Sequence, residues 1–317
     1  MKRVGTTDSG RQLVLAAVLL VEIAFFSLQA DGFLETSNLL NAVRYTAVFL
    51  VVGVGTTFGL VSGAIDISMA ATIALSGSLA TRVVAAGGTA AAGIGACLAI
   101  GALVGLANGL VVVKLRVNPL VATLGMMGIA RGAGFWLEGP GHRAWQFHSE
   151  DPVFLIFQRD LLGVPVPVVF AALVVALGHL LLSHTRLGQY AYAVGGNPES
   201  ARSAALPVDG LRIFFLVLSG FCAGIGGWMM ASMLGGTQST IAVGWELTII
   251  TAVIFGGVGL AGGTGSMVGT FLGTLILGFM VNGMSLAGWY TYQQYIAQGL
   301  LLLFALGVDA LRSGGYR

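Results

Sequence analysis

Long apolar runs constrain this chain more than any other feature. Each of the ten runs is long enough, as a helix, to cross the roughly 30 Å hydrocarbon core of a bilayer. They lie at residues 13–30, 45–63, 67–86, 91–113, 119–137, 164–182, 211–234, 244–260, 266–286 and 295–311. No strand alternation competes with them, and lipid excludes open sheets because their unpaired backbone groups find no water there. We expect an all-α, polytopic membrane protein with about ten transmembrane helices, forming a single domain over residues 1–317.

The composition agrees with a chain that lipid surrounds. Hydrophobic residues make up 56% of it and charged residues 9%, whereas soluble domains carry about 25% charged residues. The formal net charge of +2 is too small to indicate a nucleic-acid partner. Cys97 and Cys222 both fall inside apolar runs, so we expect them to pack as small residues rather than to form a disulfide or hold a metal.

The basic residues predict the orientation of the spans, because cytoplasmic loops carry the excess of lysine and arginine. With the N-terminus inside, ten basic residues fall on inner segments: Lys2, Arg3, Arg11, Lys114, Arg116, Arg186, Arg202, Arg212, Arg312 and Arg317. Four fall on outer segments: Arg44, Arg82, Arg143 and Arg159. Both termini and the central segment 183–209 are therefore expected in the cytoplasm. Run 13–30 also fits a cleaved signal peptide, but Glu22 within it and the lack of a clean cleavage site favour its retention.

The central polar segment, residues 183–209, contains the signals of a short helix. Asn197 is a suitable N-cap, because its side chain can accept a hydrogen bond from the first turn. Pro198 fits the first helical position, and Glu199 faces the positive end of the helix dipole. Pro207 is expected to end the helix after about two turns. A helix this short is not stable alone in water, so another surface must hold it.

The side chains of this helix suggest how it is held. Glu199 and Arg202 lie three residues apart, on one face. Ala201, Ala204 and Ala205 offer a small, shallow surface to a partner. The segment is either an ordinary connector between spans or a docking surface, and these residues alone leave both interpretations open.

Glycines predict close packing between helices. Two sets recur at every fourth position, which places each set on one helix face and lets backbones approach closely in lipid. The sets are Gly55, Gly59 and Gly63, and Gly101, Gly105 and Gly109.

A further glycine-rich stretch, residues 257–262, matches a dinucleotide-binding fingerprint by its letters. It lacks the strand and helix that such a site needs, and a span lies on each side of it. We expect a tight turn at residues 259–265. The sequence also contains no phosphate-binding Gly-x4-Gly-Lys-Ser/Thr motif, so the chain is not expected to hold ATP itself.

Ionisable residues within or beside the spans mark candidate functional positions, because burying them in lipid is costly. They are Glu22, Asp66, Arg131 and, at an interface, Glu246. Asp66 lies where one apolar run breaks and the next begins, which suggests irregular backbone lining protein or water. It either serves a pathway or caps the following helix. Arg131 lies near the outer end of its span, where its side chain can reach the interface, so a structural role is slightly favoured.

Four stretches resemble the permease subunits of bacterial ABC importers for monosaccharides of the ribose, xylose and arabinose type. They are residues 62–68 (SGAIDIS), 118–132 (NPLVATLGMMGIARG), 185–206 (TRLGQYAYAVGGNPESARSAAL) and 244–273. The central stretch is the most specific, and with the hydropathy pattern the resemblance covers nearly the whole chain. Ala64, where glycine is usual, and residues 69–71 depart from the family pattern, which bears on the substrate.

The resemblance implies a bacterial inner-membrane protein that is not itself an enzyme. Its partners would be a second copy or a related permease, two cytoplasmic ATPase subunits that hold ATP and Mg²⁺, and a periplasmic sugar-binding protein. It makes the helix after Asn197 a coupling helix that docks on the ATPase, with the residues Gly195, Gly196, Asn197, Pro198, Glu199, Ala201 and Arg202. Candidates for the translocation path or its gating are Asp66, Asn118, Arg131 and Glu246. The competing class is a stand-alone secondary transporter or channel, which would need an ion-coupling site; an intramembrane enzyme would need a paired nucleophile and base.

Overall fold

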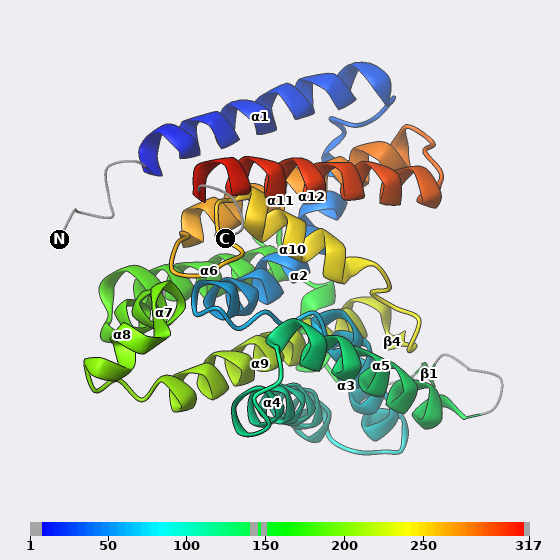
Figure 1. Ribbon diagram of the computed structural model, residues 1–317. Coiled ribbons are helices and arrows are strands. Elements are labelled where there is room, and N and C mark those ends of the chain that lie inside the picture. Colours follow the sequence, from blue (N-terminus) through cyan, green and yellow to red (C-terminus); the bar gives the residue numbers. More distant parts are fainter. Residues whose placement is uncertain (1–7, 140–144, 147–150, 314–317) are drawn as a thin grey trace.

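The computed structural model describes residues 8–139, 145–146 and 151–313. Of the charged residues counted above, Lys2, Arg3, Arg143 and Arg317 lie outside this part, as does the side chain of Arg312. The described part is a bundle of helices (Figure 1). The α-helices are α1 (Asp8–Gln29), α2 (Thr36–Val61), α3 (Met69–Ala85), α4 (Ala90–Lys114), α5 (Pro119–Glu138), α6 (Val166–His184), α7 (Arg186–Gly196), α8 (Pro198–Ser203), α9 (Val208–Leu234), α10 (Trp245–Phe255), α11 (Met267–Leu286) and α12 (Thr291–Ser313).

A short 3-10 turn and two pairs of short strands lie between the main helices. A single 3-10 turn, η1, spans Ile156–Gln158. Strand β1 (Trp145–Gln146) pairs antiparallel with β4 (Gly236–Thr237), and β2 (Asp160–Leu161) pairs with β3 (Val164–Pro165). Each strand has two residues, so the expected all-α class is confirmed.

Each apolar run identified in the sequence overlaps one of these helices. Seven helices of the described part are long and apolar enough to cross a membrane, namely α1, α2, α4, α5, α6, α9 and α11. Helices α3 and α10 are apolar but shorter. The protein is therefore a polytopic membrane protein, while the number of ten spans stays a prediction.

Helix α2 forms the centre of the bundle. Every residue from 46 to 61 is buried, and the helix contacts α6, α9, α10 and α11. Figure 1 shows α1 and α12 on one side of it and α4 and α5 on the other. Little of α2 is left for lipid, and its side chains contribute more buried residues to the central apolar cluster than those of any other helix.

The connections that were predicted to share one side of the membrane do lie together. The α2–α3 connection, helix α7 and the α10–α11 connection meet at Gly63, Gly195 and Gly262. At the other end, β1 pairs with β4, and the Arg44 guanidinium lies 2.8 Å from Oδ1 of Asp160. Helices that cross the bundle alternately produce this arrangement. It agrees with the predicted alternation of the spans, whereas which end faces the cytoplasm stays a prediction.

Packing through glycine is confirmed for α4. A Cβ atom added at Gly101 or Gly105 would collide with a backbone carbonyl oxygen of α9, and one at Gly109 would lie 2.9 Å from the Cα of Ile213. The prediction for α2 is correct only in part. Gly55 faces α9, but Gly59 faces the carbonyl of Ala64 in its own connection. Gly63 is not on the helix at all, because α2 ends at Val61.

The tight turn predicted for residues 259–265 is also confirmed. Helix α10 ends at Phe255 and α11 begins at Met267. Within the turn, the Gly259 nitrogen donates to the Thr264 carbonyl at 3.1 Å, and the Gly262 nitrogen donates to the Gly259 carbonyl at 3.1 Å. No strand precedes this turn, so the dinucleotide fingerprint has no structural counterpart here.

Candidate functional site

The central segment, in which one short helix was expected, contains two, α7 and α8. Helix α8 begins as predicted: Oδ1 of Asn197 accepts a hydrogen bond from the Ser200 nitrogen at 3.0 Å, and Pro198 occupies the first position. Its predicted end was wrong. The helix stops at Ser203, and Ala205 takes a left-handed conformation with φ 61°. Pro207 instead precedes the first residue of α9.

This left-handed ending satisfies the last carbonyls of α8 within the chain. The Ala205 nitrogen donates to the carbonyl of Arg202 at 2.9 Å, and the Leu206 nitrogen donates to that of Ala201 at 3.0 Å. Such a closing pair of bonds is usual at helix ends, although glycine rather than alanine normally occupies the left-handed position. The result is a helix of six residues, shorter than the two turns expected.

The alanine face of α8 divides between the chain's own core and its surface. Ala201 is 4% exposed and packs in a small cluster with Val194 of α7 and Val208 of α9. Ala204 and Ala205 are exposed. Therefore Ala201 holds α8 to its own chain, while the polar side chains of α8 stay exposed together with Ala204 and Ala205.

The two charged residues of α8 have different surroundings. Nη2 of Arg202 lies 2.8 Å from Oδ1 of Asp209 in the first turn of α9, and both side chains are more than half exposed. Glu199 is exposed and forms no hydrogen bond or ion pair with any other described residue. Of the two residues expected to share a face, Arg202 is therefore paired within the chain, whereas the Glu199 carboxylate is free to contact a partner.

Helix α7 is fixed at its end by backbone contacts with two other connections. A Cβ atom at Gly195 would collide with the carbonyl oxygen of Val61 and lie 2.7 Å from the Gly263 nitrogen. That nitrogen donates a hydrogen bond to the same Val61 oxygen at 2.8 Å. We call this contact of Val61, Gly63, Gly195, Gly262 and Gly263 the glycine junction. It joins Gly195 and Gly196, which precede α8, to the end of α2 and to the α10–α11 turn.

A side-chain contact reinforces the glycine junction. The hydroxyl of Tyr192 in α7 donates to the carbonyl oxygen of Gly265 at 2.8 Å. At the start of α7, Gly188 lies so close to the end of α6 that an added Cβ would collide with the Leu182 carbonyl. Because closely packed backbone and the Tyr192 hydrogen bond both join them, α7 and the α10–α11 turn are expected to move as one unit.

Asp66, a candidate for the path or its gating, lies in a closed polar cluster. It is 3% exposed. Oδ1 accepts hydrogen bonds from the nitrogen and hydroxyl of Ser68 at 2.9 and 2.6 Å, and Oδ2 accepts from the hydroxyl of Ser219 at 2.9 Å. Asn108 donates to the Ser68 hydroxyl at 2.9 Å. These contacts join the α2–α3 connection to α4 and α9, and they place Asp66 before the helix cap, Ser68, rather than at it.

Asn108 and Ser219 were not among the residues expected at this site, although each is a polar residue inside a long apolar run. Buried polar groups need partners, so isolated polar residues in different spans are candidates to meet one another. The hydropathy pattern cannot say which of them do.

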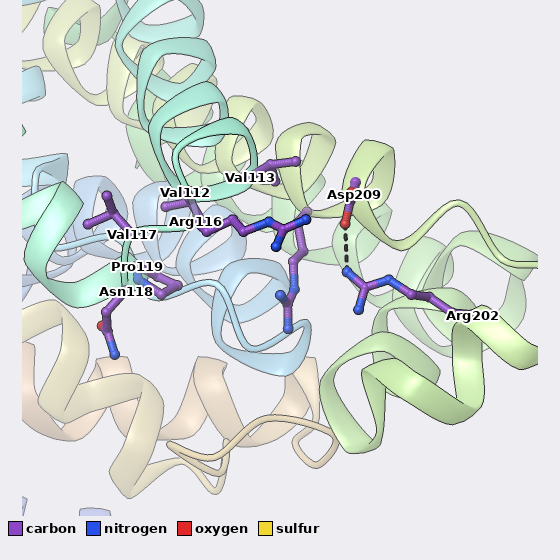
Figure 2. A pocket seen from close by; sticks show the side chains of 9 residues that line it. Val112, Val113, Arg116, Val117, Asn118, Pro119, Arg202 and Asp209 are labelled. Carbon is purple, nitrogen blue, oxygen red and sulfur yellow. Dashed lines mark hydrogen bonds and ion pairs between the residues drawn. The ribbon is translucent and has the colours of Figure 1, made fainter.

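The remaining candidates lie apart from Asp66. Oδ1 of Asn118 caps α5 by accepting from the Leu120 nitrogen at 2.9 Å, and this residue also lines a cavity next to α8 (Figure 2). Arg131 donates to the carbonyl oxygens of Ser239 and Ile241 in the α9–α10 connection. Glu246, in the first turn of α10, is close enough for its charge to attract Arg131. The structure therefore does not bring the four candidates into one site.

The described residues contain no cluster of three histidine, cysteine or acidic side chains that would suit a metal ion. In the segment between α5 and α6, His142, His148 and Glu150 lie outside the described part.

Comparison with known proteins decides the family. A family model described as the permease component of the branched-chain amino acid transport system matches residues 38–306. The chain belongs to this permease family.

Curated relatives of the permease come from sugar importers. The ribose import permease protein RbsC of Escherichia coli K12 is 37% identical over 292 residues, which is 92% of this chain and 91% of that protein. An L-arabinose ABC transporter permease protein of Azospirillum brasilense is 33% identical, covering 94% and 87%. A D-allose transport system permease protein of E. coli K12 is 32% identical, covering 93% and 90%. The predicted resemblance to sugar ABC importer permeases is confirmed. No solved structure showed a significant match to the permease.

Proposed function

We propose that this permease forms the translocation path of an ATP-driven ABC importer for a monosaccharide or a related polyol. Relatives named for ribose, L-arabinose and D-allose support the substrate class. A periplasmic sugar-binding protein delivers the substrate, and separate ATPase subunits hold ATP and Mg²⁺. The permease lies in the bacterial inner membrane with both termini in the cytoplasm.

The observation that carries this proposal is the placement of Glu199. Its carboxylate is exposed at the first turn of α8 and lacks a partner among the described residues, while the rest of α8 is held by Ala201 and the Arg202–Asp209 pair. A helix presented in this way is suited to dock into a complementary, positively charged groove. We assign α8 as the coupling helix, with Gly195 and Gly196 as its link to the bundle.

Movement of α8 would then reach the centre of the bundle by a short route. Gly195 contacts the end of α2 and the α10–α11 turn through the glycine junction. Asp66 lies three residues beyond Gly63 and ties the same connection to α4 and α9. Closure of the ATPase subunits would shift α7 and α8 together and change how α2 and α3 pack. In this mechanism Asp66 and Asn118 act at the inner end of the path, and Arg131 with Glu246 at the outer end.

Assembly with a second copy, or with a related permease, has support from α5. Gly125, Gly128 and Gly132 lie three and four residues apart and so share a face of that helix. All three are exposed, and a Cβ atom added at any of them would meet no atom within 4 Å. A small-residue face of this kind lets two helices approach closely in lipid.

Reconstitution tests the proposal. The permease, an ATPase subunit and a sugar-binding protein from the same operon are placed in liposomes, and uptake of labelled ribose, arabinose and allose is measured with ATP inside. Uptake that requires ATP hydrolysis and the binding protein is expected. Uptake that instead follows a proton gradient, with the permease alone, would identify a secondary transporter; purified permease that hydrolyses ATP by itself would also contradict the assignment.

A further inference from the structure

A cavity of about 650 Å³ opens beside the coupling helix, between the α4–α5 connection and the start of α9 (Figure 2). Three of its lining residues are arginines, namely Arg116, Arg202 and Arg212. Asp209 also lines the cavity and is acidic. Its volume is in the range of ligand-binding pockets. This cavity is separate from the exposed Glu199 face that the proposed function uses.

Among the described residues, the positive charge in the cavity is only partly balanced. Asp209 is paired with Arg202 at 2.8 Å. Arg116 and Arg212 form no ion pair with any described residue, and the Nε of Arg212 is buried without a hydrogen-bond partner there. Arg212 lies close enough to Arg202 to be repelled by its charge and close enough to Asp209 to be attracted, so one carboxylate faces three guanidinium groups.

The direction of the arginines concentrates this charge. Figure 2 shows the side chain of Arg116 reaching from the α4–α5 connection toward the Arg202–Asp209 pair. The backbone of Arg116 is left-handed, with φ 56°, a conformation that is uncommon for residues other than glycine. An anion between these guanidinium groups would relieve their repulsion, and arginine binds phosphate and carboxylate through paired N–H donors.

The walls of the cavity indicate what carries the anion. Val112, Val117 and Pro119 make part of the lining apolar. Close in sequence to these lining residues, Leu115 is 69% exposed and Val121 is 58% exposed. A free phosphate ion would use neither feature, whereas a phospholipid places its phosphate among the arginines and its acyl chains along these side chains. Basic pockets between transmembrane helices on the cytoplasmic side bind anionic headgroups in this way.

We propose that this cavity binds the phosphate of an anionic glycerophospholipid from the inner leaflet, through Arg116 and Arg212. The inference rests on the proposed function only for the side of the membrane. A bound lipid would join the α4–α5 connection to the start of α9, next to the Arg202–Asp209 pair. It would thereby restrict movement of α8, the proposed coupling helix.

Native mass spectrometry of the purified permease tests this directly, with dioleoyl-phosphatidylglycerol and dioleoyl-phosphatidylcholine as probes. Wild-type protein is expected to prefer phosphatidylglycerol. Because a basic residue near an anionic lipid changes affinity about fivefold, Arg116→Gln should lose about fivefold and the Arg116→Gln, Arg212→Gln variant about thirtyfold. Arg186→Gln removes an exposed arginine at the start of α7, outside the cavity, and is the matched control. It should retain wild-type affinity.

Three results would overturn the proposal. One is equal affinity for phosphatidylglycerol in the wild type and in Arg116→Gln, which lies in a connection and is expected to fold normally. Another is displacement of the lipid by inorganic phosphate at equal concentration, which would mean a free-ion site. The third is loss of ATPase binding by Arg116→Gln in phosphatidylcholine vesicles that contain no anionic lipid, which would assign the arginines to a protein interface. The lipid titration requires no transport, so its failure is distinguishable from failure of the proposed function.

Discussion

The Gly263 nitrogen donates a hydrogen bond to the Val61 carbonyl oxygen at 2.8 Å, across more than 200 residues of sequence. Gly195 packs against both atoms. This contact joins the last turn of the buried helix α2 to the α10–α11 turn and to the residue pair that precedes α8. The glycine junction therefore links the chain just before α8 directly to the centre of the bundle.

Substitution of Gly195 by alanine should damage this route. The added Cβ would collide with a carbonyl oxygen that α2 and the Gly263 hydrogen bond both hold in place. Overpacking of this kind costs about 1–3 kcal/mol. We expect reduced thermal stability in detergent and loss of sugar uptake. Gly210→Ala is the control, because a Cβ atom at Gly210 in α9 meets nothing within 4 Å. Equal losses of thermal stability and uptake in both variants would show that the contact of Gly195 with Val61 and Gly263 does not cause the effect.

Reversal of charge at Glu199 should uncouple the ATPase. The Glu199→Arg substitution removes an exposed carboxylate and also opposes the helix dipole. Loss of a charge-assisted contact should cost about 1–3 kcal/mol at the docking surface. Membrane abundance should stay normal, while ATPase co-purification falls and sugar uptake is lost. Asp31→Arg, an exposed position in the α1–α2 connection, is the control. Normal uptake with full ATPase retention in Glu199→Arg would return α8 to the role of a connector.

Removal of the Asn197 cap should loosen α8 without unfolding the bundle. Asn197→Ala leaves the Ser200 nitrogen without its acceptor, at a cost of about 1 kcal/mol to the local helix. Amide hydrogen exchange at Ser200 should become about fivefold faster, while exchange in α2 stays unchanged. Asn197→Ser keeps an acceptor and should resemble the wild type. Identical exchange in Asn197→Ala and the wild type would mean that the cap adds nothing to the stability of α8.

Loss of the Asp66 carboxylate should destabilise the whole protein. Asp66→Ala leaves donors of Ser68 and Ser219 without an acceptor in a closed site, and each buried unsatisfied group costs about 1–3 kcal/mol. We expect a clear fall in the unfolding temperature in detergent. Asp66→Asn keeps one acceptor and should lose less, and Asp31→Ala, which is exposed, should lose little. An unchanged unfolding temperature in Asp66→Ala would contradict a structural role for this cluster.

Cysteine labelling tests the orientation. The native cysteines are buried, with Cys97 0% and Cys222 4% exposed, so background labelling should be low. A cysteine in place of Leu162, which is 98% exposed in the β2–β3 turn, should react with an impermeant thiol reagent outside spheroplasts. One in place of Ser200 should react only after the membrane is opened. Labelling of Ser200→Cys in intact spheroplasts would reverse the predicted topology.

The sequence by itself determined the features that depend on local chemistry. Hydrocarbon thickness dictates the length of an apolar run, so each run could be found without a structure. Asn197 and Pro198 predicted the start of α8 because a cap is satisfied within its own first turn. The break at Asp66 was equally visible, since a charged residue interrupts two apolar runs.

The tertiary structure alone decided which distant groups meet. The polar residues 183–209 gave no apolar run that would predict a helix at α7. The helix forms there because it packs on the α10–α11 turn. Arg202 forms its ion pair with Asp209 rather than with Glu199, and Asp66 accepts a hydrogen bond from Ser219. The fold, and not the spacing in the sequence, sets these distances. Backbone contacts such as that between Gly195 and Val61 carry no side-chain signal at all. A sequence shows that a glycine is present, but only the packed structure shows what a Cβ atom there would strike.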